Sequence, residues 1–444
     1  MTGQRQEISP SVDHYLAEFA RVERHLPGDL IRERRERLRA FADGGFPHKK
    51  IEDWKYTDVS AIEAARFEMA TSAADVARGD LADWCPDDLD CHRAVIVDGH
   101  FQPHLSELDG LATGIRVRGL ATSLADGSAP ALGTTVNGHG SAFTDMNAAF
   151  AADGLHLRTD AGAVANKPLH VLIVASGRQD RVMAQVRNIM ELGDNSQIRV
   201  IEHYIGLGDH SYFTNAVTEV HAAPGSRLER IRIQQEHPEN GYHVASFHAR
   251  QQRDSRIINY GIDLGGRLAR IDTNSTLDDT GAEIHLYGVY APTGDQHVDN
   301  HTRVDHAKPH GTSREAYKGV LSGKSRGVFN GKVIVHKDAQ KTDSEQSSDS
   351  LLLSKQAVVD AKPELEIYAD DVKCAHGSTV GQLDEDAVFY LMSRGLDQDG
   401  ARAVLTYSFV DEIIGQIDLE PIRIFLERAV LEKLPAGSRF AGLA

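Results

Sequence analysis

A polar turn followed by an alternating strand recurs along the chain between about residues 167 and 373. In each case a glycine-containing turn precedes spaced apolar residues: Gly193-Asp194-Asn195-Ser196 before Ile198 and Val200, Pro224-Gly225-Ser226 before Leu228, Ile231 and Ile233, Gly265-Gly266 before Leu268 and Ile271, and Thr280-Gly281-Ala282 before Ile284 and Leu286. Such repetition favours a stacked β-solenoid with an aliphatic interior over a closed barrel. Because the spacings are irregular, a sandwich of short strands is the competing interpretation.

Helical periodicity characterises the start of the chain. Apolar residues recur at helical spacing over residues 12–22, and a highly charged second helix is expected over residues 29–41. Pro27-Gly28 separates the two. Further along, residues 93–101 resemble a hairpin with its turn at Asp98-Gly99.

Three amphipathic helices are expected after the repetitive region. Asp384 is a good N-cap for the first helix and Gly395 a good stop, the second runs over residues 399–416, and the third begins at Pro421. These helices either pack wholly on the end of the solenoid or form a docking surface for a partner. We therefore divide the chain into an N-terminal helical and mixed region (1–160), a β core (161–380) and a C-terminal helical subdomain (381–444).

Composition narrows the classes of function. The formal net charge of -17 argues against nucleic acid or an anionic membrane as the main partner. The apolar run at residues 171–175 is far too short to span a bilayer, and the first residues contain no apolar signal core. Three cysteines cannot build a disulfide framework, which indicates a reducing compartment. We expect a cytoplasmic protein.

Cys374 and His376 form the most informative pair of side chains. In an extended backbone, residues two apart point to the same side, so a soft thiolate and an imidazole would share one face. Metals that take such ligands want about four, so the pair would be half of a site, completed by another chain or by a transient cargo. On spacing alone, a cysteine that is simply a small buried apolar residue is the more frequent case.

Other candidate residues carry weaker signals. His297, His301, His306 and His310 form the densest group of histidines, but the local alternation predicts a strand, on which such spacing is too long for one ion. Hydrogen-bonded or solvated histidines are the better interpretation. Cys91-His92, close to Cys85, could bind metal only adventitiously. The chain contains no Gly-x4-Gly-Lys-Ser/Thr loop, so any ATP hydrolysis must belong to a partner.

Several motifs resemble one known family. Residues 368–381 and the following 382–395 closely resemble the C-terminal signature of the SufB/SufD family, the scaffold of the SUF iron–sulfur assembly system. Upstream similarity is found at residues 317–320, 329–333, 339–343 and 351–354. Lys50-Ile51-Glu52-Asp53-Trp54-Lys55-Tyr56-Thr57 resembles the SufD branch in particular, as do the chain length and the few cysteines.

The resemblance implies a fold and a function. The fold would be mainly β with α flanks: a right-handed parallel β-helix core with an N-terminal helical region and a C-terminal helical subdomain. The function would be that of a non-catalytic SufD-like subunit of a cytosolic complex with a SufB-like paralogue and a SufC-like ABC-type ATPase, which would dock at the C-terminal helices. A homodimer is possible in isolation.

The resemblance also implies the place of the cargo. His376, with Cys374 beside it, would contribute to a transient iron–sulfur cluster of unspecified type at the interface with the SufB-like partner. Lys373 and His376 would help to lower the pKa of the Cys374 thiol. The apolar phase switches at Asp370-Asp371, which predicts a bulge or bend that re-aims the pair.

Two other functions compete with this one. A parallel β-helix enzyme acting on polysaccharide could use Asp263, Asp272, Asp278 or Asp279, although aromatic residues make up only 6% of the chain and sugar clefts favour aromatic platforms. A purely architectural subunit, with Cys374 and His376 inert, is the other alternative.

Overall fold

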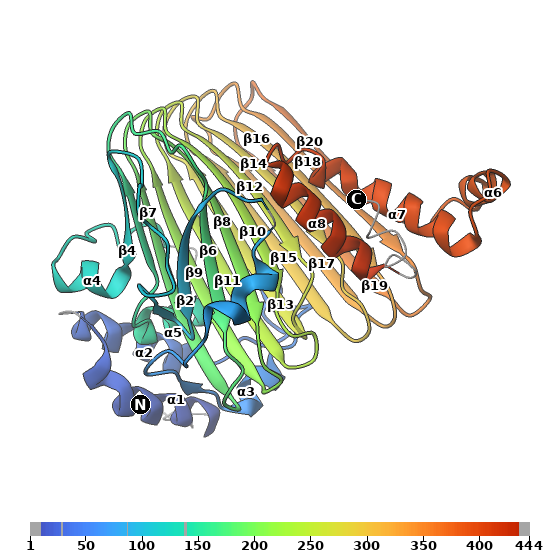
Figure 1. The fold of residues 1–444 in the computed structure, drawn as a ribbon. Helices are drawn as coiled ribbons and strands as arrows, with labels where there is room; N and C mark the ends of the chain where they lie inside the picture. Colours follow the sequence, from blue (N-terminus) through green and yellow to red (C-terminus); the bar gives the residue numbers. More distant parts are fainter. Residues whose placement is uncertain (1–9, 28–29, 87, 137–139, 435–444) are drawn as a thin grey trace, which may run out of the picture.

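Two ten-stranded sheets face each other and form the body of the protein (Figure 1). The structure, a computed structural model, describes residues 10–27, 30–86, 88–136 and 140–434. One sheet has the order β19-β17-β15-β13-β11-β9-β7-β5-β4, with β1 also on β7, and the other the order β20-β18-β16-β14-β12-β10-β8-β6-β2-β3. From β5 onward the chain alternates between the sheets, and each strand pairs in parallel with the strand two places later. The result is a β-solenoid of about 8 turns, which confirms the stacked solenoid and excludes the sandwich.

The strands grow longer and more regular toward the middle of the chain. Their bounds are β1 Glu68–Met69, β2 His92–Val97, β3 His100–Phe101, β4 Ile115–Gly119, β5 Leu155–Thr159, β6 Leu169–Ala175, β7 Val182–Leu192, β8 Gln197–Gly206, β9 Tyr212–Ala222, β10 Arg227–Gln235, β11 Gly241–Gln251, β12 Arg256–Asp263, β13 Leu268–Leu277, β14 Glu283–Tyr290, β15 His297–His306, β16 Thr312–Leu321, β17 Arg326–Val335, β18 Asp343–Leu352, β19 Val358–Ile367 and β20 Lys373–Gly381.

Helices flank the solenoid on both sides. The α-helices are α1 Pro10–Val22, α2 Ile31–Gly44, α3 Ser60–Ala65, α4 Leu120–Ala125, α5 Ala142–Phe150, α6 Glu385–Ser393, α7 Gln398–Ile414 and α8 Glu420–Lys433, and short 3-10 helices occur at Glu23–His25, Glu52–Trp54 and Arg78–Trp84. No helix of the described residues has the length and apolar character needed to cross a membrane.

The helix and hairpin boundaries follow the local signals in the sequence. The Asp384 side chain accepts a hydrogen bond from the backbone N–H of Asp386, as expected for an N-cap, and Gly395 after α6 has φ +102°. Asp98 and Gly99 both have positive φ, at 48° and 85°, and join antiparallel β2 and β3. Positive φ at both central residues is the type I′ geometry that the Asp-Gly pair predicts.

The solenoid interior is only partly aliphatic, which corrects the expectation from the sequence. Along β10, Ile231 and Ile233 point outward beneath the C-terminal helices, whereas Arg230 and Arg232 alternate with them and point to the inner face. Inside, Arg230 pairs with Glu202 at 2.6 Å and Arg232 with Asp263 at 2.6 Å. The alternation correctly predicts strands. Because helices bury the outer face as well, apolar residues do not mark the inner face alone.

Each outer face has its own helical cover. The N-terminal helices pack aromatic residues against the odd-numbered sheet, with Phe143 of α5 edge-on to Phe213 of β9 at 5.8 Å. The inner half of α7 and all of α8 pack against the even-numbered sheet through Val410, Ile414 and Leu426. Figure 1 shows α8 lying across these strands while α6 projects away from them.

Candidate functional site at the open end of the solenoid

The last turn of the solenoid is uncovered. Among the described residues, β19 pairs only with β17 and β20 only with β18, so each strand leaves one backbone edge without a strand partner. Large apolar side chains are exposed on this turn: Val358, Ile367, Tyr368 and Val380. Long open edges with apolar side chains are rarely left bare in a stable protein. This end therefore has the properties of a surface that another chain covers.

A bend joins the two last strands and sets the direction of β20. Residues 368–372 lie between β19 and β20, with bends at Asp370 and Asp371, so the chain crosses from one sheet to the other there. Asp371 is held to the preceding turn, because its backbone N–H donates to Oε1 of Gln340 at 2.9 Å and its carboxylate pairs with Lys341. The expected change of phase is confirmed, and its cause is a sheet-to-sheet bend.

Cys374 and His376 lie on the same face of β20, the face that continues the solenoid interior. In the pairing of β20 with β18, Cys374 lies next to Ser344 and His376 next to Gln346. Ser344 and Gln346 are both buried inside the solenoid. The Cys374 side chain is half-buried against the interior apolar cluster, and His376 is exposed at the open end. The pair is thus presented at the mouth of the solenoid rather than on its flank.

The environment of Cys374 corrects the expected effect on its thiol. Burial raises the pKa of Cys374, and the negative charge of Asp343 raises it further. Lys373 points to the opposite face of the strand, so its ammonium does not counter this effect. In the isolated chain Cys374 is therefore a poorer metal ligand than the sequence indicated, since the thiolate is the ligating form.

A buried carboxyl lies two strands below His376. In-register pairing places Glu315 of β16 next to Gln346 of β18, and Gln346 next to His376 of β20, all on the inner face. Glu315 accepts hydrogen bonds from Oγ1 of Thr302 at 2.6 Å and Nε2 of Gln346 at 3.2 Å. Burial raises the pKa of Glu315 to about 7. This row of polar groups was not predicted from the sequence, since only the strand register brings its members together.

The other sequence candidates have separate partners. His297 contacts Oγ1 of Thr57 at 2.8 Å, His301 contacts Asp299 at 3.1 Å and His306 contacts Oγ of Ser313 at 2.9 Å. His297 and His301 lie on the outer face of β15 and His306 on the inner face, while His310 lies in a turn with φ 61°. These findings agree with hydrogen-bonded histidines on a strand.

Cysteine and carboxylate candidates are likewise dispersed. Cys85 and Cys91 are free, half-buried thiols whose pKa values burial raises. Asp263 is paired inside the solenoid with Arg232, whereas Asp272 pairs with Arg270 on the outer face of the other sheet at 2.7 Å. In the described part of the chain, no three His, Cys, Asp or Glu side chains form a group that could hold a metal ion.

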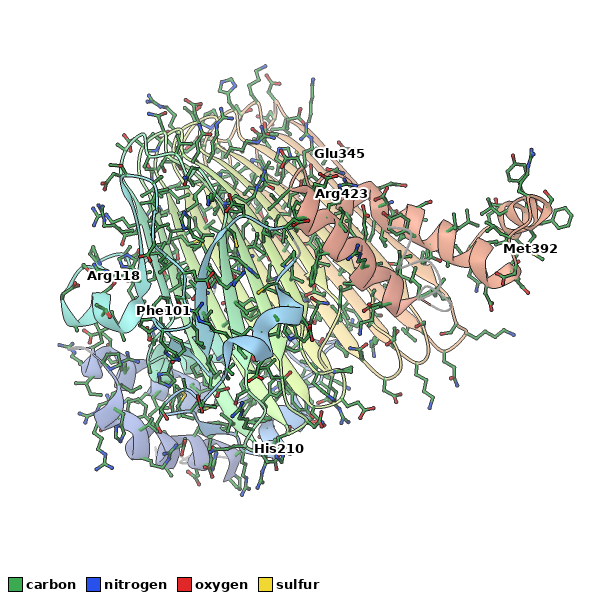
Figure 2. The ribbon with its side chains drawn as sticks, in the orientation of Figure 1. Phe101, Arg118, His210, Glu345, Met392 and Arg423 are labelled. Carbon is green, nitrogen blue, oxygen red and sulfur yellow. The ribbon has the colours of Figure 1, made fainter. Side chains whose placement is uncertain are left out.

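Helix α6 carries three exposed large apolar side chains. Phe389 is 71% exposed and Tyr390 56% exposed, and Met392 is also exposed. Figure 2 shows Met392 at the tip of the projecting helices, away from the solenoid. Only Val388 of α6 is fully buried. The C-terminal subdomain thus both packs on the solenoid, through α8 and the inner half of α7, and presents a free surface, through α6.

Comparison with known proteins identifies the family. The family model described as "SUF system FeS cluster assembly, SufBD core domain" matches residues 173–409, and that of the "SufBD protein N-terminal region" matches residues 8–171. The chain belongs to the SufB/SufD family. The iron-sulfur cluster assembly protein SufD of Escherichia coli is 31% identical over 89% of this chain and 91% of its own length, which supports the SufD branch.

Two further relatives agree with this assignment. An iron-sulfur cluster assembly SufBD family protein of Synechocystis is 30% identical over 86% of each chain. The chloroplastic protein ABCI7 of Arabidopsis thaliana is 28% identical over 85% of this chain and 80% of its own length. The expected resemblance to a family of the SUF iron–sulfur assembly system is confirmed. The roles of Cys374 and His376 stay predictions.

Proposed function

We propose that this protein is the SufD-like, non-catalytic subunit of a scaffold complex that assembles iron–sulfur clusters in the cytoplasm with a SufB-like paralogue and a SufC-like ATPase. The observation that carries the proposal is the position of His376 and Cys374 on the last, uncovered turn of the solenoid. The nascent cluster is the cargo of the complex. The family assignment and the names of the relatives, which are assembly proteins, support this function.

This chain offers fewer ligands than an iron–sulfur cluster needs, so a second chain is required. Cluster irons take about four ligands each from sulfide and protein, and β20 offers one imidazole and one half-buried thiol. A SufB-like paralogue that covers the open edges of β19 and β20 would bring further thiolates to the same mouth. His376 is the main ligand from this chain and Cys374 the lesser one, because His376 is exposed whereas burial keeps the Cys374 thiol protonated.

The ATPase docks on the projecting part of the C-terminal subdomain. Phe389, Tyr390 and Met392 provide aromatic and methionine side chains of the kind that dominate interface energetics. Helix α8 offers less surface for this contact, because Leu426 and Val430 are buried against the solenoid. ATP-driven movement of α6 would be transmitted to the solenoid through α7, which contacts β14 and β16.

Replacement of His376 by alanine tests the ligand role. His376→Ala removes an exposed imidazole and no apolar packing, so the fold and the complex should form normally. Iron and acid-labile sulfide bound to the anaerobically purified complex should fall severalfold, and cellular complementation should be impaired. Since neutral imidazole is the ligating form, cluster binding by the wild type should also weaken as the solution is acidified.

His210→Ala is the matched control. His210 is an exposed histidine far from the open end (Figure 2), so its removal should leave cluster content unchanged. If the His376→Ala complex assembles and its iron, sulfide and complementation equal those of the wild type, the ligand role is wrong and the subunit is architectural. Cys374→Ser should reduce cluster content less than His376→Ala.

A further inference from the structure

A cavity is lined by residues of α2, α4 and α5. These helices lie at the other end of the molecule from β20 (Figure 1). The cavity has a volume of about 270 Å³, and its lining includes Arg34, Leu124, Leu132 and Arg187. One wall is apolar, because Leu124 and Leu132 pack with Leu120 against β7. The lining also carries the guanidinium groups of Arg34 and Arg187. The cavity is far in sequence and in the fold from Cys374 and His376, so it does not depend on the cluster function.

Arg34 is an unusual residue for such a position. Its side chain arises from the first turn of α2 and is only 4% exposed. Nη1 donates to the backbone carbonyls of Ala149 at 3.1 Å and Ala151 at 2.8 Å, which lie at the end of α5. Among the described residues, no carboxylate pairs with this guanidinium, and Nε is buried with no acceptor. Buried cations are normally paired, so the missing partner requires an explanation.

The neighbouring charge does not supply that partner. The guanidinium of Arg187 already forms an ion pair with Glu219 at 2.6 Å and donates a hydrogen bond to Oδ1 of Asn147 at 3.2 Å. Burial and the positive charge of Arg187 lower the pKa of Arg34 to about 10. At the rim Arg37 pairs with Asp145 at 3.2 Å, and the exposed residue Glu36 pairs with Arg32. Glu33 is exposed at the rim and forms no ion pair with Arg34. The buried part of the cavity therefore has an excess positive charge.

We propose that this cavity binds a small monocarboxylate with an apolar body. The carboxylate would accept charge-assisted hydrogen bonds from the guanidinium group of Arg34 that lines the cavity. The apolar body would lie along Leu120, Leu124 and Leu132. The volume is at the small end of the range of ligand sites, so the ligand is a short fatty acid or an aromatic acid rather than a nucleotide.

Calorimetric titration of the full-length protein tests the proposal, with hexanoate, octanoate and benzoate as probes. At least one of them should bind, octanol should bind at least ~10-fold more weakly than octanoate, and inorganic phosphate should not compete. Hydrogen exchange should slow in α2 and α4 when the acid is bound. No binding at millimolar concentration, or equal affinity for octanoate and octanol, would overturn the proposal, as would binding of phosphate in place of the carboxylates.

Three variants separate binding from structure. Arg34→Met should weaken binding of the acid by at least ~10-fold, whereas Arg32→Met, on the same helix but with a side chain 83% exposed, should not. Because loss of Arg34 also removes its bonds to α5, Leu132→Trp provides an independent test. It fills the half-buried apolar side of the cavity and leaves the guanidinium intact. A folded Leu132→Trp protein that binds the acid as tightly as the wild type would show that the cavity is not the site.

Discussion

At the scale of single residues, Glu315 is the group whose chemistry depends most on the fold. Its carboxyl is wholly buried, and Oε1 has no hydrogen-bond partner among the described residues. Burial raises the pKa from the ordinary value of 4.5 to about 7. Between these two pH values the folded protein holds a proton that the unfolded chain has lost. The stabilising contribution of the neutral carboxyl is thus complete below about pH 4.5 and disappears as the pH rises through 7.

This decrease of stability with rising pH gives a prediction for Glu315→Gln. The variant keeps the shape of the neutral acid and cannot ionise, so it should lose less stability than the wild type between pH 5 and pH 7.5, by about 2 kcal/mol and at most about 3. Chemical denaturation at the two pH values measures the difference, and the contributions of other groups cancel. Glu345→Gln, an exposed carboxylate on the neighbouring strand β18, is the control and should show the wild-type dependence. Identical pH dependence of wild type and Glu315→Gln would contradict the raised pKa.

At the scale of elements, the C-terminal subdomain divides into a docked part and a free part. Leu426 of α8 is fully buried against the sheet, and Phe425 packs edge-on to His203 of β8 at 5.5 Å. Helix α7 is held near its inner end by the pair of Lys318 with Glu412 and by Lys318 over the Phe409 ring at 4.3 Å. These contacts fix α7 as an arm that carries α6 away from the solenoid.

This division predicts that truncating a side chain to alanine destabilises the protein strongly in α8 and hardly at all in α6. Leu426→Ala should lower the free energy of unfolding by about 2–5 kcal/mol, because it opens a cavity between α8 and the sheet. Phe389→Ala should change it by less than about 0.5 kcal/mol, since the ring lies in solvent. Thermal and denaturant unfolding of both variants measure the contrast. A strongly destabilising Phe389→Ala would mean that α6 packs against the protein and is not free to bind a partner.

The free part should carry the affinity for the ATPase. The double variant Phe389→Ser/Met392→Ser alters two positions on one side of α6 and should weaken binding of a SufC-like ATPase by at least ~10-fold. Val164→Ser, an exposed apolar residue on the solenoid, should leave binding unchanged. Titration by surface plasmon resonance supplies the comparison. If the double variant binds the ATPase with the affinity of the wild type, the ATPase docks on another surface.

Local signals predicted most elements, but not the neighbours that give residues their chemistry. The Asp384 cap, Gly395 and the Asp98-Gly99 turn depend on adjacent residues only, and their geometry was correctly predicted from sequence. The inward position of Arg230 was not predicted, because the apolar residues beside it are buried under a helix about two hundred positions later in the chain. Glu315 and Arg34 owe their environments to pairing register and helix packing, which no short motif encodes.

At the scale of the whole molecule, the two ends of the solenoid differ. The first turns are covered by the N-terminal region, in which β2 continues the even-numbered sheet beyond β6 and β4 the odd-numbered sheet beyond β5. The last turn has no such continuation within the described residues, and inner-face side chains become the end surface there. Ile367, Cys374, His376 and Val380 thus share one mouth, so covering the apolar edge and completing the cluster site would be a single event.

If one partner both covers the edge and completes the cluster site, positive charges placed on the exposed edge of the last turn should disrupt both. The double variant Ile367→Lys/Val380→Lys should fold, because both side chains are already exposed, yet the lysines would have to be desolvated when a partner covers them. Affinity for the SufB-like paralogue should fall by at least ~10-fold, and any homodimer of the isolated protein should dissociate to monomer. Light scattering after size exclusion measures both. Cluster content should fall along with complex formation although His376 and Cys374 are intact. A normal complex with a normal cluster would show that the partner and its ligands approach by another face.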